Sequence, residues 1–259
     1  ASQIRFMPRA LWDMDRLGVS KPEARFAATP PLLPGAQPTV TLDAAASVAS
    51  GSELTEFVWR FEDGPEAKGK QVTKALKPGA THRVTLQVRD KRGQSDTRTS
   101  HVTMPPAWLL ALDPKTTVVA EAESFAAEGV GKVQIFDRVG NSGKMISYWH
   151  EAVGHWLEWK VNVPKSGRYK VVLKYATDSA DTQRDFQVDG QHPGVAFKKF
   201  HLSSTGGFCT VTDNWAYHTV GGEKSPAPIN LAAGPHTLRM TNLGDGCALD
   251  FILLVPVDG

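Results

Sequence analysis

The chain has 259 residues, of which 41% are apolar and 22% are charged, a balance typical of a protein that buries a sizeable core in water. The formal charge is only +2, and no stripe of lysine and arginine concentrates it, which argues against nucleic acid as a partner. The longest apolar runs fall far short of the ~20 residues that a transmembrane helix requires, so we expect no membrane span.

Residues 1–26 match neither of the two domains predicted below. Their mixture of charged and apolar side chains predicts either a strap laid over the first domain or the tail of a larger upstream unit. The opening residues do not have the pattern of a signal peptide and are typical of a mature or trimmed product.

From there on, short runs of β-branched and aromatic residues alternate with turn residues, and no stretch keeps a helical period over three turns. This pattern predicts an all-β fold. Within residues 81–90, Val84, Leu86 and Val88 alternate with polar side chains, as in a strand with one wet face. Trp59 lies in another such run and is predicted to anchor the core.

The segments FVWRFEDG (57–64) and THRVTLQVRDKRGQSDTRTSHVTM (81–104) carry a resemblance. An aromatic strand that ends in Asp-Gly, a Val-Thr-Leu strand, a glycine turn and a final strand together resemble the polycystic-kidney-disease (PKD) type of module. The resemblance covers about residues 30–104 and implies an immunoglobulin-like β-sandwich, which we place at residues 27–104. Modules of this kind usually act as spacers.

A domain boundary is predicted at residues 105–117, where prolines interrupt the rhythm of the strands. This linker is apolar, and its tryptophan and leucines are expected to pack against protein instead of remaining in water.

Beyond the linker, residues 118–259 read as a second β domain. The runs WLEWKVNV (156–163) and RYKVVLKYA (168–176) each place large apolar residues at alternate positions, and a PKSG turn separates them. They predict two strands joined by a hairpin.

Three carboxylates in this domain lack an obvious neutralising group. Glu121 and Glu123 are two residues apart in VVAEAESF (118–125), so on a strand they share a face, and Asp250 lies inside the apolar run ALDFILL. A buried carboxylate without a partner costs several kcal/mol, and that strand contains no basic residue. If the first and last strands of the domain are neighbours, the three carboxylates form an oxygen cage that suits Ca²⁺.

The segments VVAEAESF, WLEWKVNV, RYKVVLKYA and ALDFILL, together with RDFQVDG and INLAAGPHTLRMTNLGDGC, are similar to carbohydrate-binding modules of families 6 and 35. The similarity covers residues 118–256. The resemblance implies a jelly-roll β-sandwich with a structural calcium at the three carboxylates. Carbonyl groups of residues 140–144 would complete its coordination.

In these families, aromatic side chains on loops at one edge of the sandwich stack on sugar rings. The loop before Trp156 offers Tyr148 and Trp149, and the loop TDNWAYHTV offers Trp215 and Tyr217. The family asparagine before the last strand is replaced here by Ala248. Asn214 and Asn242 are predicted to bind sugar hydroxyls in its place, with Asp213, Asp245 or a binding site elsewhere as the alternatives.

Cys209 and Cys247 are the only cysteines, and both lie in glycine-rich segments. In a secreted protein they are expected to form a disulfide, the alternative being two buried free thiols.

No nucleophile elbow, phosphate-binding loop or zinc motif occurs, so we expect no catalysis by this chain. The predicted function is noncatalytic binding of a polysaccharide or oligosaccharide by a secreted or cell-surface monomer, which targets a covalently attached polysaccharide-degrading domain to its glycan. Two alternatives stay open, a cell-surface adhesion or assembly module with a protein partner and a glycan-cleaving enzyme. The small positive charge slightly favours an acidic glycan.

Overall fold

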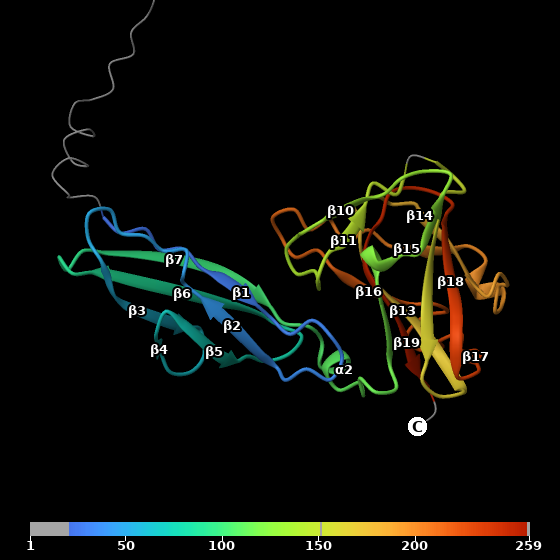
Figure 1. Ribbon diagram of the computed structural model, residues 1–259, viewed down its shortest axis with the longest axis horizontal. Helices are drawn as coiled ribbons and strands as arrows, with labels where there is room; N and C mark the ends of the chain where they lie inside the picture. Colours follow the sequence, from blue (N-terminus) through green and yellow to red (C-terminus); the bar gives the residue numbers. More distant parts are fainter. Residues whose placement is uncertain (1–20, 151, 258–259) are drawn as a thin grey trace, which may run out of the picture. The chain divides into compact units, whose positions relative to one another are not determined.

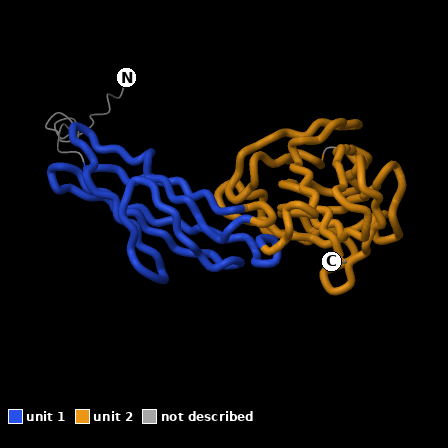
Figure 2. The backbone as a smooth tube through the Cα atoms, turned by 60° about the horizontal axis from the view of Figure 1, so that its bottom comes forward, with its two compact units in different colours: residues 1–31, 36–110 blue, residues 32–35, 111–259 orange. Residues whose placement is uncertain are grey.

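The computed structural model describes residues 21–150 and 152–257. The chain forms two compact units, one from residues 1–31 and 36–110 and the other from residues 32–35 and 111–259 (Figure 2). The predicted strap or tail lies in residues 1–26, and its first 20 residues are outside the described part of the chain.

The first unit consists of two antiparallel sheets. The smaller has the order β1-β2-β5, and the larger has the order β4-β3-β6-β7 (Figure 1). The strands are β1 (Ala27–Thr29), β2 (Thr39–Asp43), β3 (Leu54–Phe61), β4 (Ala67–Lys68), β5 (Gln71–Ala75), β6 (Thr81–Asp90) and β7 (Ser95–Thr103).

The core of the first unit confirms the predicted alternation. Trp59 and the three apolar residues of β6 have no solvent-exposed surface. The indole of Trp59 donates a hydrogen bond to the Gly69 carbonyl at 2.8 Å, and Phe26 packs edge-on against its ring. Ala24 is also buried in this core, so residues 21–26 belong to the first unit.

The predicted linker contains one turn of helix, α2 (Ala107–Leu110), which begins directly after two prolines. Leu109 on this turn is fully buried, as expected for an apolar linker, whereas Trp108 is 38% exposed, contrary to the expectation for that residue.

The second unit is a sandwich of two antiparallel sheets. One contains β10, β11, β19, β13 and β16 in that order, with β8 also paired to β19 and β17 to β13; the other has the order β15-β14-β18-β12-β9. The strands are β8 (Val118–Glu121), β9 (Ala127–Gly129), β10 (Gln134–Phe136), β11 (Met145–Ser147), β12 (Trp156–Val163), β13 (Gly167–Ala176), β14 (Thr182–Val188), β15 (Phe200–Leu202), β16 (Ala216–Thr219), β17 (Ile229–Leu231), β18 (Gly234–Asn242) and β19 (Ala248–Pro256). Two short 3₁₀ helices are η1 (Ala122–Ser124) and η2 (Val195–Phe197).

The two predicted strands of the hairpin are β12 and β13, and their alternate apolar residues fill the core between the sheets. The two strands belong to different sheets, so they are not paired with each other. The first and last strands of the unit do pair, with Glu121 opposite Phe251.

The strand predicted for residues 118–125 ends early. β8 stops at Glu121 and the chain turns into η1, so Glu121 and Glu123 do not share the face of one strand. The turn is needed because the chain leaves one sheet here for the other. The Trp159 indole donates to the Ala122 carbonyl at 3.1 Å, and the Ala126 amide donates to Glu158 of β12 at 2.7 Å.

Candidate functional site

A pocket of about 250 Å³ lies in the second unit where β11 meets three loops. The loops follow β10, β11 and β15, and a fourth wall comes from the residues before β19. The lining residues are Arg138, Met145, Ser147, Tyr148, His150, Phe208, Thr210, Gly246 and Cys247.

Tyr148 presents an exposed ring at this pocket. Its side chain is 45% exposed, and its backbone has the unusual φ of 60° directly after β11. The ring centroid lies 5.6 Å from that of Phe136 and 6.0 Å from that of His150, so both neighbours support it. A flat, supported and exposed ring is suited to stacking on the apolar face of a sugar.

Arg138 supplies the positive charge of the pocket. Its guanidinium carbon lies 4.6 Å from the centroid of the Phe136 ring, and its backbone amide is held by the Asn141 side chain at 2.7 Å. No aspartate or glutamate lines the pocket. Hydroxyls of Ser147 and Thr210 add donors and acceptors around the Tyr148 ring.

Trp149, predicted as a stacking platform, is instead part of the core. It has no exposed surface, its indole donates to the His155 carbonyl at 3.1 Å, and its ring lies 6.4 Å from that of Trp159. The guanidinium of Arg184 lies over the Trp149 ring, with its carbon 4.9 Å from the ring centroid. Because the ring is fully covered by protein, the prediction for Trp149 is wrong.

Asn242 is likewise buried, and its prediction as a sugar contact is wrong. Its side-chain oxygen accepts a hydrogen bond from Arg184 at 2.8 Å, and its amide nitrogen donates to the Ala152 carbonyl at 3.0 Å. Arg184 also donates to the carbonyls of Trp149 and Asp245. This buried arginine therefore joins the loop that carries Tyr148 to the loop that carries Gly246.

The remaining predicted sugar contacts do not line the pocket. Trp215 is half-buried, and its indole donates to the Val139 carbonyl at 2.9 Å. Asn214 donates from its side chain to the Thr205 carbonyl at 3.4 Å. Tyr217 lies on β16 beside Phe251, where burial and the charges of Asp250 and Asp213 raise the pKa of its phenol. Ala248 is buried beneath this region, so no side chain reaches out from the position of the family asparagine.

The predicted disulfide is absent: Cys209 and Cys247 are both free and buried. Cys247 packs in the main core of the unit, whereas Cys209 packs with Met145, Ala176 and Ala248. Each sulfur has its own partner, since the Asn214 amide donates to Cys209 Sγ and the Cys247 thiol donates to the Ala248 carbonyl. Burial raises the pKa of the Cys209 thiol to about 12 and that of Cys247 to about 11.

We therefore expect two thiols to react with a maleimide once the unreduced protein is denatured, and almost none in the folded state, because thiolate is scarce and access is blocked. Mass spectrometry counts the labels. A denatured, unreduced sample that takes up no label would contradict the free thiols.

The three predicted metal ligands converge on one loop, residues 140–144. Asp250 accepts from the Ser142 amide at 2.9 Å, Glu121 accepts from the Ser142 hydroxyl at 2.8 Å, and Glu123 accepts from the Lys144 amide at 2.9 Å. The second oxygen of Glu123 is buried and has no hydrogen-bond partner.

Asp250 has a basic partner on the neighbouring strand. Lys174 of β13 lies 2.8 Å from its carboxylate and also donates to the Gly140 carbonyl at 2.6 Å. Three carboxylates against this one ammonium group leave two uncompensated negative charges when all are ionised. Burial, followed by the charges of Asp250 and Glu123, raises the pKa of Glu121 to about 7. Within residues 21–150 and 152–257, no group of three or more His, Cys, Asp or Glu side chains is arranged so that it could hold a metal ion by itself.

Sequence reasoning missed Phe136, Arg138, His150 and Phe208. Among the rings at this pocket, the sequence predicts only Tyr148. Phe136 lies in a short strand, where a phenylalanine indicates a core residue. Arg138 follows the strand in a turn, where an arginine ordinarily indicates a solvated surface.

Comparison with known families gives two matches. Residues 19–104 match the family model described as PKD domain, and residues 131–239 match the model described as carbohydrate binding module (family 35). No curated protein matches the chain.

Solved structures resemble each unit. A family 35 carbohydrate-binding module from Clostridium thermocellum is 23% identical over 54% of this chain and 98% of its own, with a TM-score of 0.43. A family 6 module of Cellvibrio mixtus lichenase 5A, solved with cellotriose, is 23% identical over 54% and 97%, with a TM-score of 0.41. The PKD1 domain of a Vibrio cholerae metalloprotease is 23% identical over 33% and 99%, with a TM-score of 0.29. No helix among the described residues is long and apolar enough to cross a membrane.

Proposed function

We propose, on the premise that the chain carries a PKD-type domain followed by a family 35 carbohydrate-binding module, that it binds an oligosaccharide or polysaccharide in the pocket beside Tyr148. The observation that carries the proposal is the exposed Tyr148 ring, held by Phe136 and His150 at the mouth of a pocket in the matched module.

The chemistry of the pocket suits a sugar. The C–H face of a pyranose is apolar and weakly positive, so it packs on the tyrosine ring, while Ser147, Thr210 and Arg138 provide hydrogen bonds for the hydroxyls at its rim. Trp215 packs against the same small cluster as Phe136 and the pocket residue Phe208, and on this ground we expect it to extend the contact to a longer glycan. Since most of a bound oligosaccharide stays in water, micromolar to millimolar affinity is expected, about −4 to −8 kcal/mol.

In the longer protein that we envisage, the first domain is a spacer and the second holds a covalently attached polysaccharide-degrading domain near its substrate. Tethering of this kind acts by raising the effective concentration. Both domains would then act outside the cell, on a secreted or surface-attached protein.

We also propose that Glu121, Glu123 and Asp250 hold a structural calcium ion. The unpartnered Glu123 oxygen and the two excess negative charges match a divalent cation that prefers oxygen ligands. Bound calcium would neutralise the cluster and fix residues 140–144, which lead from the pocket residue Arg138 to β11.

The calcium proposal predicts a pH-dependent stabilisation. Without metal, Glu121 keeps its proton in the folded state up to about pH 7, whereas in the unfolded chain its pKa is 4.5. The folded state thus binds more protons, and stability falls as pH rises from about 4.5 to about 7. Calcium, which needs the ionised carboxylate, should recover that loss, so its effect on the melting temperature should grow over the same range.

At pH 8 and a calcium concentration of about 100 times Kd, stabilisation is about 2.7 kcal/mol, or a rise of about 5–10 °C in the melting temperature. Differential scanning fluorimetry in EDTA and in calcium measures it. Glu123→Gln should abolish most of the rise, and Glu223→Gln, on an exposed loop, should leave it. An identical melt in EDTA and calcium at pH 8 would contradict the calcium site.

A glycan array, followed by chromatography of the bound oligosaccharide, tests the function. We expect binding to at least one glycan class without release of shorter products. Cleavage would identify an enzyme instead. No glycan binding, combined with capture of a surface protein, would favour the adhesion module.

A further inference from the structure

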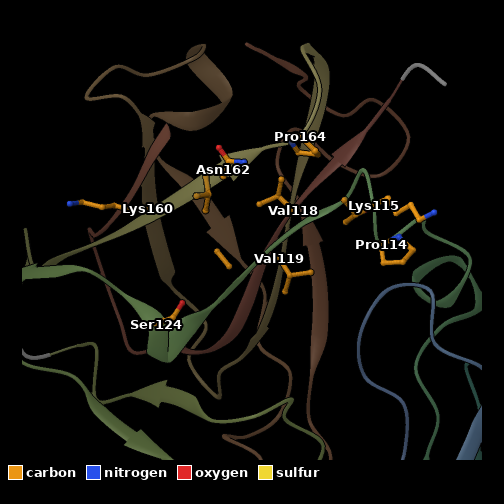
Figure 3. A pocket seen from close by; sticks show the side chains of 11 residues that line it. Pro114, Lys115, Val118, Val119, Ser124, Lys160, Asn162 and Pro164 are labelled. Atoms are coloured by element: carbon orange, nitrogen blue, oxygen red, sulfur yellow. The ribbon is translucent and has the colours of Figure 1, made fainter. Parts of the chain in front are cut away.

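A second pocket, of about 370 Å³, lies in the same unit between β8 and β12 (Figure 3). It shares no lining residue with the pocket beside Tyr148. Its walls come from the segment that precedes β8, from β8 itself and from Lys160–Asn162 of β12. Pro114 and Pro164 lie toward one end in Figure 3, and Ser124 lies toward the other.

The pocket exists because two strand edges are left uncovered. β8 pairs with β19, and β9 covers β12 only at Trp156–Glu158. The Glu158 carbonyl accepts from Ala126 on that side, so by alternation the backbone groups of Lys160 and Asn162 point toward the same uncovered side. No strand of the described residues pairs with them there.

The charged residues that line this pocket are of one sign, although Asp113 outside the lining accepts from the Lys115 backbone amide at 2.9 Å. Lys115 and Lys160 flank it on opposite sides in Figure 3, both are exposed, and no aspartate or glutamate lines it. Neither lysine forms an ion pair within the part of the chain that the structure describes. Thr117 in the wall is buried, and its hydroxyl has no hydrogen-bond partner.

We propose that this pocket binds an anionic saccharide that carries two or more carboxylate or sulfate groups, one met by Lys115 and another by Lys160 on the opposite side. The Asn162 side chain and the free backbone groups of β12 bind its hydroxyls, and the valines of β8 contact its apolar C–H groups. No aromatic ring lines the pocket, so the ligand is selected by its charge and not by stacking.

An extended peptide fits the pocket less well. The two uncovered edges belong to different sheets of the sandwich, and packed sheets are about 10 Å apart, so one added strand cannot pair with both. A lysine on an edge strand also opposes the addition of a further strand.

The test titrates the full chain with trigalacturonic acid, with its methyl ester and with a heparin tetrasaccharide, by calorimetry at about 50 mM and about 300 mM salt. The acid or the sulfated sugar should bind, the ester should bind at least about tenfold more weakly, and salt should weaken the binding. Which of the two anions binds identifies the anionic group.

Lys115→Gln combined with Lys160→Gln should lower the affinity at least about tenfold. Asn162→Asp, an exposed substitution of the same size, should do the same with an unchanged melting temperature. Lys198→Gln combined with Lys224→Gln removes the same charge elsewhere and should have no effect. Tyr148→Ala separates this site from the first pocket, because it should leave anion binding intact. The proposal would be overturned if neither anion bound, if both pairs of lysine substitutions lowered the affinity equally, or if Tyr148→Ala lowered it. An extended peptide without lysine that competed as strongly as the anionic saccharide would also overturn it.

Discussion

Replacing Asp250 by asparagine should lower the free energy of unfolding by about 3–5 kcal/mol, even in EDTA. Asp250 is fully buried, and the Lys174 ammonium 2.8 Å away is itself almost completely enclosed. The substitution keeps the shape of the side chain but removes the carboxylate that forms the 2.8 Å ion pair with that ammonium, a direct contact that neither Glu121 nor Glu123 makes among the described residues. Urea denaturation followed by fluorescence measures the change, with the exposed Asp178→Asn as the matched control.

The reciprocal variant sharpens this prediction. Lys174→Met alone leaves Asp250 without its ion-pair partner and should also be strongly destabilising, whereas combining Lys174→Met with Asp250→Asn should cost less than the sum of the two. Additive effects in EDTA would show that the two side chains do not act as a pair.

Tyr148→Ala should weaken binding of whichever glycan the array identifies by more than about 1 kcal/mol, at least fivefold in Kd, while the fold is retained. The ring is exposed and contributes little to the core, so its loss removes the stacking surface and not the packing. Tyr148→Phe keeps the ring and should keep most of the affinity. Circular dichroism checks the fold of each variant, and isothermal titration calorimetry measures Kd.

Val153→Ala is the control, since this exposed residue belongs to the same loop and does not line the pocket. Equal affinity of Tyr148→Ala and the parent protein would exclude a stacking role for the tyrosine.

The two sandwiches were predictable because alternation of apolar residues is a local signal. In β6 and β12, every second residue had to be buried whatever the strand's neighbours, and the structure confirms this. The early end of β8 was not predictable, because it depends on where the chain must cross to the other sheet. The hydrogen bond from Trp159 to Ala122 that accompanies the crossing joins residues 37 positions apart.

In the candidate site, too, local sequence predicts some features and contacts between distant residues decide the others. Tyr148 and Trp149 are adjacent, so one side chain faces outward when the other faces the core, and their composition alone did not decide which. The decision comes from Arg184, 35 residues away from Trp149, which covers the tryptophan ring and holds its carbonyl. Lys174 could not be predicted as the partner of Asp250 for a similar reason. Within its own strand it occupies a polar position of the alternation, and only the pairing of β13 with β19 places it beside Asp250.

The most direct test of glycan binding at Tyr148 is a nuclear magnetic resonance titration of the ¹⁵N-labelled chain with the glycan found on the array. The proposal predicts that the shifts concentrate at Ser147, Tyr148, Thr210 and the Arg138 side chain, with little change around Lys115 and Lys160 for a neutral glycan. Shifts confined to residues away from this pocket, or no shifts at millimolar glycan, would contradict it.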